Sequence, residues 1–155
     1  MQDTARSLPL FDLTDKKALV TGSTRGIGKA IARILGQAGA ELFVHGSRRS
    51  DTLDATVCEF RTLGITVHAC AADIADSAAN RRLVAETGRV DILVLNASLQ
   101  YKTAWLEIDS AQFEQQIATN VRSTLELIQG YAPAMLERRW GRILAIGSVN
   151  QERQH

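Results

Sequence analysis

One glycine-rich stretch has the residue types and the spacing to bind phosphate. The stretch reads Thr21-Gly22-Ser23-Thr24-Arg25-Gly26-Ile27-Gly28. It follows a short apolar run and precedes apolar residues at helical spacing, so a strand, a tight turn and a helix are expected in that order. The unpaired N–H groups and the positive dipole end of such a helix suit a pyrophosphate. A plain glycine turn is the alternative, but the flanking strand and helix favour a nucleotide site.

The three glycines of this stretch have different expected roles. Gly22 lets the chain turn sharply off the strand, Gly26 lets the backbone approach a phosphate, and Gly28 lets the helix pack close to the sheet. We therefore expect the whole turn to contact a dinucleotide through Gly22, Ser23, Thr24, Arg25, Gly26, Ile27 and Gly28.

The residues after the second expected strand indicate which dinucleotide is preferred. A carboxylate there would pair with the ribose 2′-hydroxyl of NAD and repel a 2′-phosphate. This chain instead reads His45-Gly46-Ser47-Arg48-Arg49, with no acidic residue before Asp51. Arg48 can form a forked pair with a phosphate, Ser47 can donate to it, and Arg25 adds a cation. The sequence predicts NADP(H) rather than NAD(H); the alternative is that Arg48 and Arg49 are solvated charges at a helix start.

The elements that must position these residues alternate along the chain. Strands are expected over 17–20, 41–45, 65–70, 91–95 and 142–146, and helices over 26–38, 51–63, 76–88 and 110–137. Strands alternating with helices predict βαβ units, a parallel sheet and right-handed crossovers. The expected fold class is α/β, a Rossmann-like doubly wound sheet with strand order 3-2-1-4-5 in a single domain spanning 1–155. The cofactor would lie beyond the strand carboxyl ends, where the order reverses.

Two expectations concern the apolar side chains and the cysteines. The long helix carries one slowly drifting apolar face, made of Phe113, Ile117, Val121, Leu125, Ile128, Ala132 and Met135. Cys58 and Cys70 have neither metal-ligand nor disulfide spacing and are expected to be small buried hydrophobic residues. The three histidines are scattered, so no metal site is assigned.

Composition excludes some classes of partner. The net charge is +1, from 18 basic and 17 acidic residues, which gives no electrostatic reason to expect nucleic acid or an anionic membrane as a partner. The first residues have no apolar leader, and no apolar run is long enough to span a bilayer. A cytoplasmic, reducing compartment is therefore expected.

At its glycine-rich stretch, Thr21–Gly28, the chain resembles the short-chain dehydrogenase/reductase family, whose opening motif is Thr-Gly-x-x-x-Gly-Ile-Gly. The resemblance recurs at Asp73, Asn96-Ala97, Asn120 and Ser148, and so covers nearly the whole chain from Lys17 onward. It implies an oxidoreductase that transfers hydride between a nicotinamide and a carbonyl or alcohol substrate.

The resemblance implies further site residues. Asp73, followed by Ile74, would accept from the adenine amino group, although a turn-capping Asp is the alternative. Asn96, Ala97 and Ser98 stand where the family usually has Asn-Ala-Gly, and would face the nucleoside. Asn120 would hold a water of the proton relay, with a structural helix Asn as the alternative; a buried Asn needs a hydrogen-bond partner, so one is expected. Ser148 would hydrogen-bond the substrate carbonyl oxygen, with a turn-forming Ser after a strand as the alternative.

One part of the family pattern does not occur in the printed sequence. The family's proton donor is a Tyr in Tyr-x-x-x-Lys, about a dozen residues after the Ser, whose Lys lowers the tyrosine pKa. Trp105 and Met135 follow Tyr101 and Tyr131 at the Lys position. We therefore expect no significant turnover from this polypeptide alone. A part of a longer reductase, a non-catalytic dinucleotide-binding module and a non-functional truncation are the three interpretations.

Substrate identity is indicated only by short segments. The loop after the fourth strand and the segment around Ser148 look similar to gluconate-type sugar-acid oxidoreductases, and a 3-oxoacyl carrier-protein reductase is the other possibility. The family resemblance also implies that a full-length form is a homo-oligomer.

Overall fold

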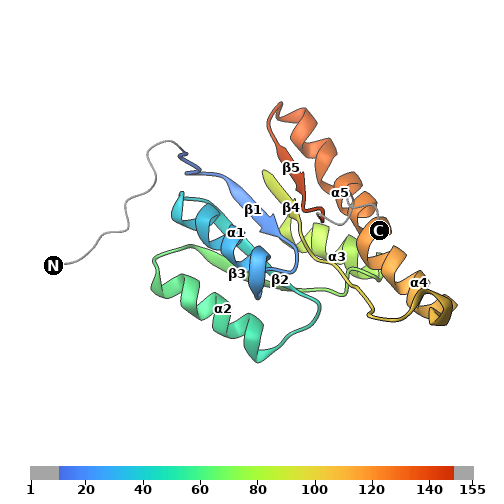
Figure 1. Ribbon diagram of the computed structural model, residues 1–155. Coiled ribbons are helices and arrows are strands. Elements are labelled where there is room, and N and C mark those ends of the chain that lie inside the picture. Colours follow the sequence, from blue (N-terminus) through green and yellow to red (C-terminus); the bar gives the residue numbers. More distant parts are fainter. Residues whose placement is uncertain (1–10, 149–155) are drawn as a thin grey trace.

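Residues 11–148 are described by the computed structural model, and they form one five-stranded parallel sheet flanked by helices (Figure 1). The strands are β1 (Lys17–Val20), β2 (Glu41–Gly46), β3 (Val67–Ala71), β4 (Ile92–Leu95) and β5 (Arg142–Ala145). The helices are α1 (Gly26–Gln37), α2 (Asp51–Thr62), α3 (Ser77–Thr87), α4 (Ser110–Ile117) and α5 (Ser123–Glu137). The strand order is β3-β2-β1-β4-β5, so the predicted α/β topology is confirmed.

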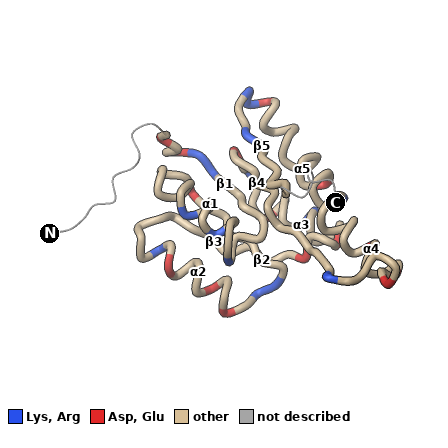
Figure 2. The backbone as a smooth tube through the Cα atoms, in the orientation of Figure 1, with Lys and Arg blue, Asp and Glu red and all other residues tan. Residues whose placement is uncertain are grey.

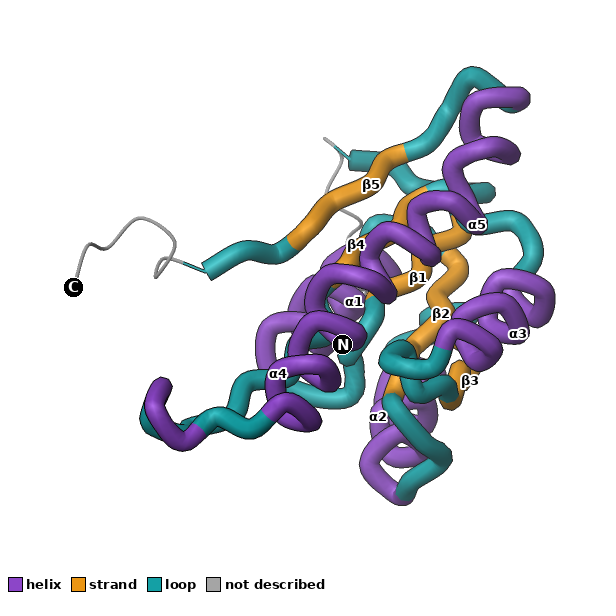
Figure 3. Tube along the Cα trace, turned by 90° about the vertical axis from the view of Figure 1, so that its right-hand side faces the viewer, coloured by secondary structure: helices purple, strands orange, loops and turns teal. Residues whose placement is uncertain are grey.

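Both faces of the sheet are covered, which explains why its central strands are almost wholly apolar. Successive residues of β1 point to opposite faces: Val20 belongs to the cluster under α1 and α2, and Leu19 to the cluster under α3 and α5. Figures 1 and 3 show these two helix pairs on opposite sides of the strands. Parallel register sets Val20 beside Val44 of β2 and Val94 of β4, so these three strands end at one edge.

Side-chain caps fix where three of the helices begin. Ser50 Oγ accepts from the Leu53 amide at 3.3 Å, and Asp76 Oδ1 accepts from the Ala78 amide at 2.8 Å. Asp109 does the same for α4, with 2.7 Å to the Gln112 amide. Arg25 precedes α1 and makes no such bond. The first turn of α1 therefore has no side-chain cap, in contrast to α2, α3 and α4.

The long helix expected over 110–137 is divided. A π-helical segment (Ala118–Arg122) separates α4 from α5, and a short 3₁₀ turn (Trp105–Glu107) precedes α4. A π turn holds one residue more than an α turn, so it rotates the faces on either side of it relative to each other. No helix in the part of the chain described here is long and apolar enough to cross a membrane.

The expected apolar face of this helix is wrong over its first half. Phe113, Ile117, Val121 and Leu125 are all exposed. The buried row is instead Ser123, Leu127, Tyr131 and Met135. The row includes Tyr131 because its hydroxyl lies 2.8 Å from Thr87 Oγ1 on α3, which satisfies the polar atom in the core.

Two smaller expectations also need correction. Cys58 lies on the exposed side of α2, whereas Cys70 is buried as expected, and burial raises the pKa of its thiol to about 12. The third strand begins at Val67 rather than at residue 65, because Ile65 packs under α1 as part of the turn after α2. Within residues 11–148, β5 pairs only with β4, and all four of its residues are exposed.

Candidate nucleotide-binding site

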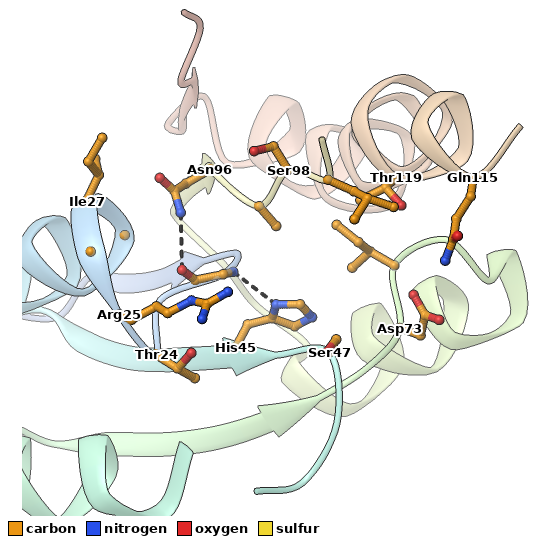
Figure 4. Close-up of a pocket in the computed structure, with 16 residues that line it drawn as sticks. Thr24, Arg25, Ile27, His45, Ser47, Asp73, Asn96, Ser98, Gln115 and Thr119 are labelled. Atoms are coloured by element: carbon orange, nitrogen blue, oxygen red, sulfur yellow. Dashed lines mark hydrogen bonds between the residues drawn. The ribbon is translucent and has the colours of Figure 1, made fainter. Parts of the chain in front are cut away.

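A cavity of about 730 Å³ opens at the carboxyl edge of the sheet, where β1 lies between β2 and β4 (Figure 4). This is the position at which the strand order reverses, and in doubly wound folds it is where ligands bind. The residues that line the cavity are Gly22, Thr24, Arg25, Gly26, Ile27, Gly28, His45, Ser47, Asp73, Ile74, Asn96, Ala97, Ser98, Leu99, Gln115 and Thr119.

Most of the predicted cofactor residues therefore meet in one place. Twelve of the fourteen line the cavity, and Ser23 and Arg48 do not. Ser23 is fully buried: its Oγ donates to Val20 O at 2.7 Å and accepts from the His45 amide at 2.9 Å. Ser23 thus joins the glycine turn to β2 from behind. Arg48 is exposed on the loop that follows Ser47.

The glycine turn has the shape that its sequence predicts, but the structural requirement for each glycine differs in part from the expected one. Gly26 has a φ of +57°, and a Cβ placed there would touch nothing, so its requirement is the left-handed backbone. A Cβ on Gly28 would lie 2.4 Å from Asn96 Nδ2 and 2.5 Å from Gly22 O. Gly28 is therefore needed because α1 packs directly against the glycine turn and the loop after β4.

His45 supports the turn from the floor of the cavity. Its Nδ1 accepts from the Gly22 amide at 3.1 Å, so the ring proton is on Nε2, which donates to Ala72 O at 2.9 Å. Burial lowers the pKa of His45 to about 4, although Ala72 O and the Asp73 carboxylate partly oppose the shift. The ring is consequently neutral at physiological pH. This role was not predicted, because its only signal in the sequence is one polar residue in an apolar strand.

Thr21 and Asn96 hold the loop after β4 against the turn. Thr21 Oγ1 accepts from the amides of Asn96 at 2.9 Å and Ala97 at 3.0 Å. The Asn96 side chain donates to Thr21 O at 2.9 Å and to Gly22 O at 3.2 Å, as Figure 4 shows in part. Asn96 therefore reaches the cavity wall while its amide nitrogen is occupied by the protein. Ser98, where the family has Gly, has a negative φ, so the replacement causes no backbone strain.

The loop after β2 places cations beside the cavity. Figure 2 shows acidic and basic residues interspersed over the chain, with a basic segment on the loop between β2 and α2. Arg49, which precedes α2, forms an ion pair at 2.6 Å with Asp54 in the first turn of that helix. Among residues 11–148 no ion pair engages Arg48 or Arg25, and the Arg25 guanidinium lies in the cavity (Figure 4).

The two predicted catalytic residues lie outside the cavity lining. Asn120 belongs to the π-helical segment and is exposed rather than buried. It has a hydrogen-bond partner, as expected, and this partner is the backbone of Leu99: Oδ1 accepts from Leu99 N and Nδ2 donates to Leu99 O, both at 2.8 Å. Ser148 follows β5 at the same edge of the sheet. Within the described residues no group of three His, Cys, Asp or Glu side chains is placed to hold a metal ion.

The opposite wall of the cavity was not anticipated. Gln115 of α4 and Thr119 of the π-helical segment face the loop after β3 that carries Asp73 and Ile74. They could not be found from sequence, because nothing in the chain order places α4 across from β3.

Comparison with known proteins gives a consistent result. The chain is 35% identical over 150 residues to 2-dehydro-3-deoxy-D-gluconate 5-dehydrogenase of Formosa agariphila, covering 94% of this chain and 57% of that protein. A 3-oxoacyl (acyl-carrier-protein) reductase of Agrobacterium tumefaciens with NADP bound has a TM-score of 0.86 and 36% identity, over 97% of this chain and 58% of that one. A gluconate 5-dehydrogenase of Burkholderia cenocepacia in complex with NADP and tartrate has a TM-score of 0.84 and 30% identity, covering 94% and 58%.

The chain thus spans little more than half the length of the relatives it matches. The family described as short chain dehydrogenase matches residues 16–155, nearly the whole sequence. Together with the parallel sheet and the cavity at its reversal point, this match identifies the chain as a member of the short-chain dehydrogenase family.

Proposed function

We propose that this chain is the NADP(H)-binding part of an oxidoreductase that interconverts a carbonyl compound and an alcohol. The observation that carries the proposal is the uncapped first turn of α1, which faces the cavity where the strand order reverses. Its amide groups and positive dipole end are placed to receive a pyrophosphate. Both solved relatives described above contain NADP, which supports the same cofactor here.

The choice of NADP(H) over NAD(H) rests on charge at the end of β2. No carboxylate stands there to accept the ribose hydroxyls, and Ser47 and Arg25 both line the cavity. Arg48 follows on an exposed loop without an ion pair to any described residue, so it can turn toward a 2′-phosphate. Arg49 is a poorer candidate because Asp54 already neutralises it.

A titration of the purified chain with NADPH and NADH, followed by nicotinamide fluorescence, tests this proposal. NADPH should bind more tightly than NADH. The Arg48→Asp substitution should reverse the preference, because it replaces a phosphate ligand with a charge that repels phosphate and accepts from a ribose hydroxyl. Arg49→Asp, on the neighbouring residue, is the matched control and should change the ratio less. An unchanged NADPH dissociation constant in Arg48→Asp would contradict the assignment of Arg48.

The catalytic part of the proposal concerns Ser148 and Asn120. A Ser hydroxyl past β5 can hydrogen-bond the oxygen of a substrate carbonyl and so stabilise the negative charge that develops as hydride arrives. Asn120 positions the loop after β4 through Leu99, at the side of the cavity that leads toward β5. The substrate class we propose is a sugar acid or a 3-oxoacyl compound, because the relatives are described as acting on these two classes.

A non-catalytic dinucleotide-binding module is the second candidate function. It is favoured by one specific observation: twelve of the predicted cofactor residues line one cavity within residues 11–148, whereas no Tyr-x-x-x-Lys occurs in the printed sequence. NADPH binding without turnover by any longer form of the chain would establish this alternative. We also propose that the chain is a single domain and that longer forms are homo-oligomers, for which the exposed apolar row on α4 and α5 gives support.

A further inference from the structure

A buried threonine on α2 connects this helix to the glycine turn. Thr56 Oγ1 donates to Thr24 O at 3.1 Å and to Thr52 O at 2.8 Å. A helical Thr commonly bonds the carbonyl four residues before it, which accounts for the contact with Thr52. The contact with Thr24 instead joins residues 32 positions apart. Thr56 is 1% exposed, so its single hydroxyl proton is shared between these two carbonyl oxygens without competition from water.

The hydrogen bond from Thr56 fixes the peptide that leads into Arg25. Thr24 O and the Arg25 N–H belong to one trans peptide plane and point in opposite directions. Because the oxygen is held toward α2, the N–H is directed away from this helix. Arg25 has an extended backbone, with φ −158° and ψ 170°, and its guanidinium lies in the cavity (Figure 4). The position of this cation therefore depends on the contact between Thr24 and Thr56.

The loop that carries the second cation meets the glycine turn beside the same helix. Gly46, the last residue of β2, marks the meeting point. A Cβ on Gly46 would lie 3.3 Å from Thr24 Cγ2 and 3.4 Å from Arg48 O. The helix α2 begins at Asp51, three residues after Arg48. A shift of the turn relative to α2 would therefore change the separation between Arg25 and Arg48.

We propose that Thr56 is a positioning residue for the preference of this chain for NADP(H). Through Thr24 it keeps Arg25 at the separation from the loop after β2 that lets Arg25 and Arg48 bind the same 2′-phosphate. Charge-assisted bonds between a guanidinium and a phosphate depend on distance and direction. Thr56 itself does not line the cavity. The proposal rests on the proposed binding of NADP(H), and it concerns only the phosphate by which NADP(H) differs from NAD(H).

The ratio of the NADH to the NADPH dissociation constant, with both followed by nicotinamide fluorescence, tests this role. Thr56→Val removes the hydroxyl and should weaken NADPH binding by about three- to tenfold. NADH binding should change by less than about twofold, because both cofactors share the pyrophosphate that the turn receives through its backbone N–H groups. Thr56→Ala, which places no second methyl group near the two carbonyls, should lower the ratio in the same way. Thr56→Ser keeps the hydroxyl and should keep the ratio of the unmodified chain.

Thr62→Val is the matched control. Thr62 is an exposed threonine at the end of the same helix, and its hydroxyl donates to Glu59 O at 2.7 Å. Removal of that hydroxyl should leave the ratio unchanged. A thermal melt of each variant establishes that the chain is folded.

A double-mutant cycle tests whether Thr56 acts through Arg25. Arg25→Gln removes the cation, so that Thr56→Val in this background has no guanidinium left to position. The second substitution should then change NADPH affinity by no more than about twofold. Losses that simply multiply in the double variant would show that Thr56 acts by another route, and would contradict the proposal.

Two further outcomes separate this inference from the function on which it rests. An equal loss of NADPH and NADH affinity in Thr56→Val, with the ratio unchanged, is the result of a merely structural contact and would overturn the inference. Absence of NADPH binding to the unmodified chain, or equal binding of NADPH and NADH, would instead overturn the proposed function.

Discussion

The cavity floor depends on a single neutral imidazole. His45 is 1% exposed, and its two ring nitrogens connect the glycine turn to the end of β3. Protonation would place a second N–H against the Gly22 amide, so that two donors would face each other. The ring thus ties the shape of the phosphate-facing turn to its own protonation state.

Stability should consequently fall in mild acid. The pKa of His45 is lowered from 6.5 to about 4 in the folded chain, so the unfolded chain binds the additional proton between these values. The contribution of neutral His45 to the free energy of unfolding is complete above pH 6.5 and is lost as the pH falls toward 4. The loss amounts to about 2 kcal/mol between pH 6.5 and pH 5. Urea unfolding across this range measures it. In His45→Gln this part of the dependence of unfolding free energy on pH should disappear. The same dependence on pH in both proteins would show that another group is responsible.

At the scale of single residues, some members of the site could be predicted from the sequence and others could not. The glycines and the cations after β2 could be predicted from residue type and local spacing, and Asp73 from the family resemblance. Thr21, His45 and Gln115 could not, since each acts through a hydrogen bond to a residue at least 14 positions away. Such bonds depend on how far apart two elements finally lie, which residue type and spacing do not determine.

Among the elements, the π-helical segment between α4 and α5 is the main departure from regular geometry. Periodicity alone predicted one helix with one apolar face, and the structure has two helices whose inward faces differ. An apolar stripe shows that a helix has two unlike faces, but not which face meets the sheet. The contacts of Tyr131 and Leu127 with the core under α3 and α5 decide that question here.

A matched pair of substitutions in α5 tests this assignment. Leu127 is fully buried and Leu125 is 56% exposed, although they lie two residues apart. Leu127→Ala should lower the free energy of unfolding by about 2–5 kcal/mol, because it leaves a cavity in the core. Leu125→Ala should change it by no more than about 0.5 kcal/mol, as expected of a surface position. Urea denaturation of dilute protein compares the two, and the reverse order would contradict the placement of α5.

For the molecule as a whole, the alternation of apolar runs and helical patterns was sufficient to predict the sheet. Short connections and right-handed crossovers leave few arrangements of five parallel strands, and the observed order is the predicted one. The edges of this sheet could be anticipated less well. β5 is exposed along its whole length, in contrast to the fully buried β4.

Binding and turnover should separate in a chain of this sequence. The groups that would bind NADPH are present, whereas the Tyr-x-x-x-Lys proton donor of the family is not in residues 1–155. We therefore expect saturable NADPH binding and no measurable NADPH oxidation with keto sugars, keto acids or 3-oxoacyl esters. Absorbance at the reduced-nicotinamide band, recorded with the same samples used for titration, checks both statements. Turnover with any of these substrates would require a proton donor that the family resemblance does not supply.

The pairing of Asn120 with Leu99 connects the π-helical segment to the loop after β4. The side-chain amide of Asn120 both accepts from and donates to the backbone of Leu99. This pair of hydrogen bonds resembles the pairs that join neighbouring strands, and here it joins a helical segment to a loop. The link sits on the widened turn that separates α4 from α5. A ligand that displaces this loop would have to break both hydrogen bonds or move the π-helical turn together with the loop. The position of the loop after β4 and that of the π-helical segment are therefore linked through these two hydrogen bonds.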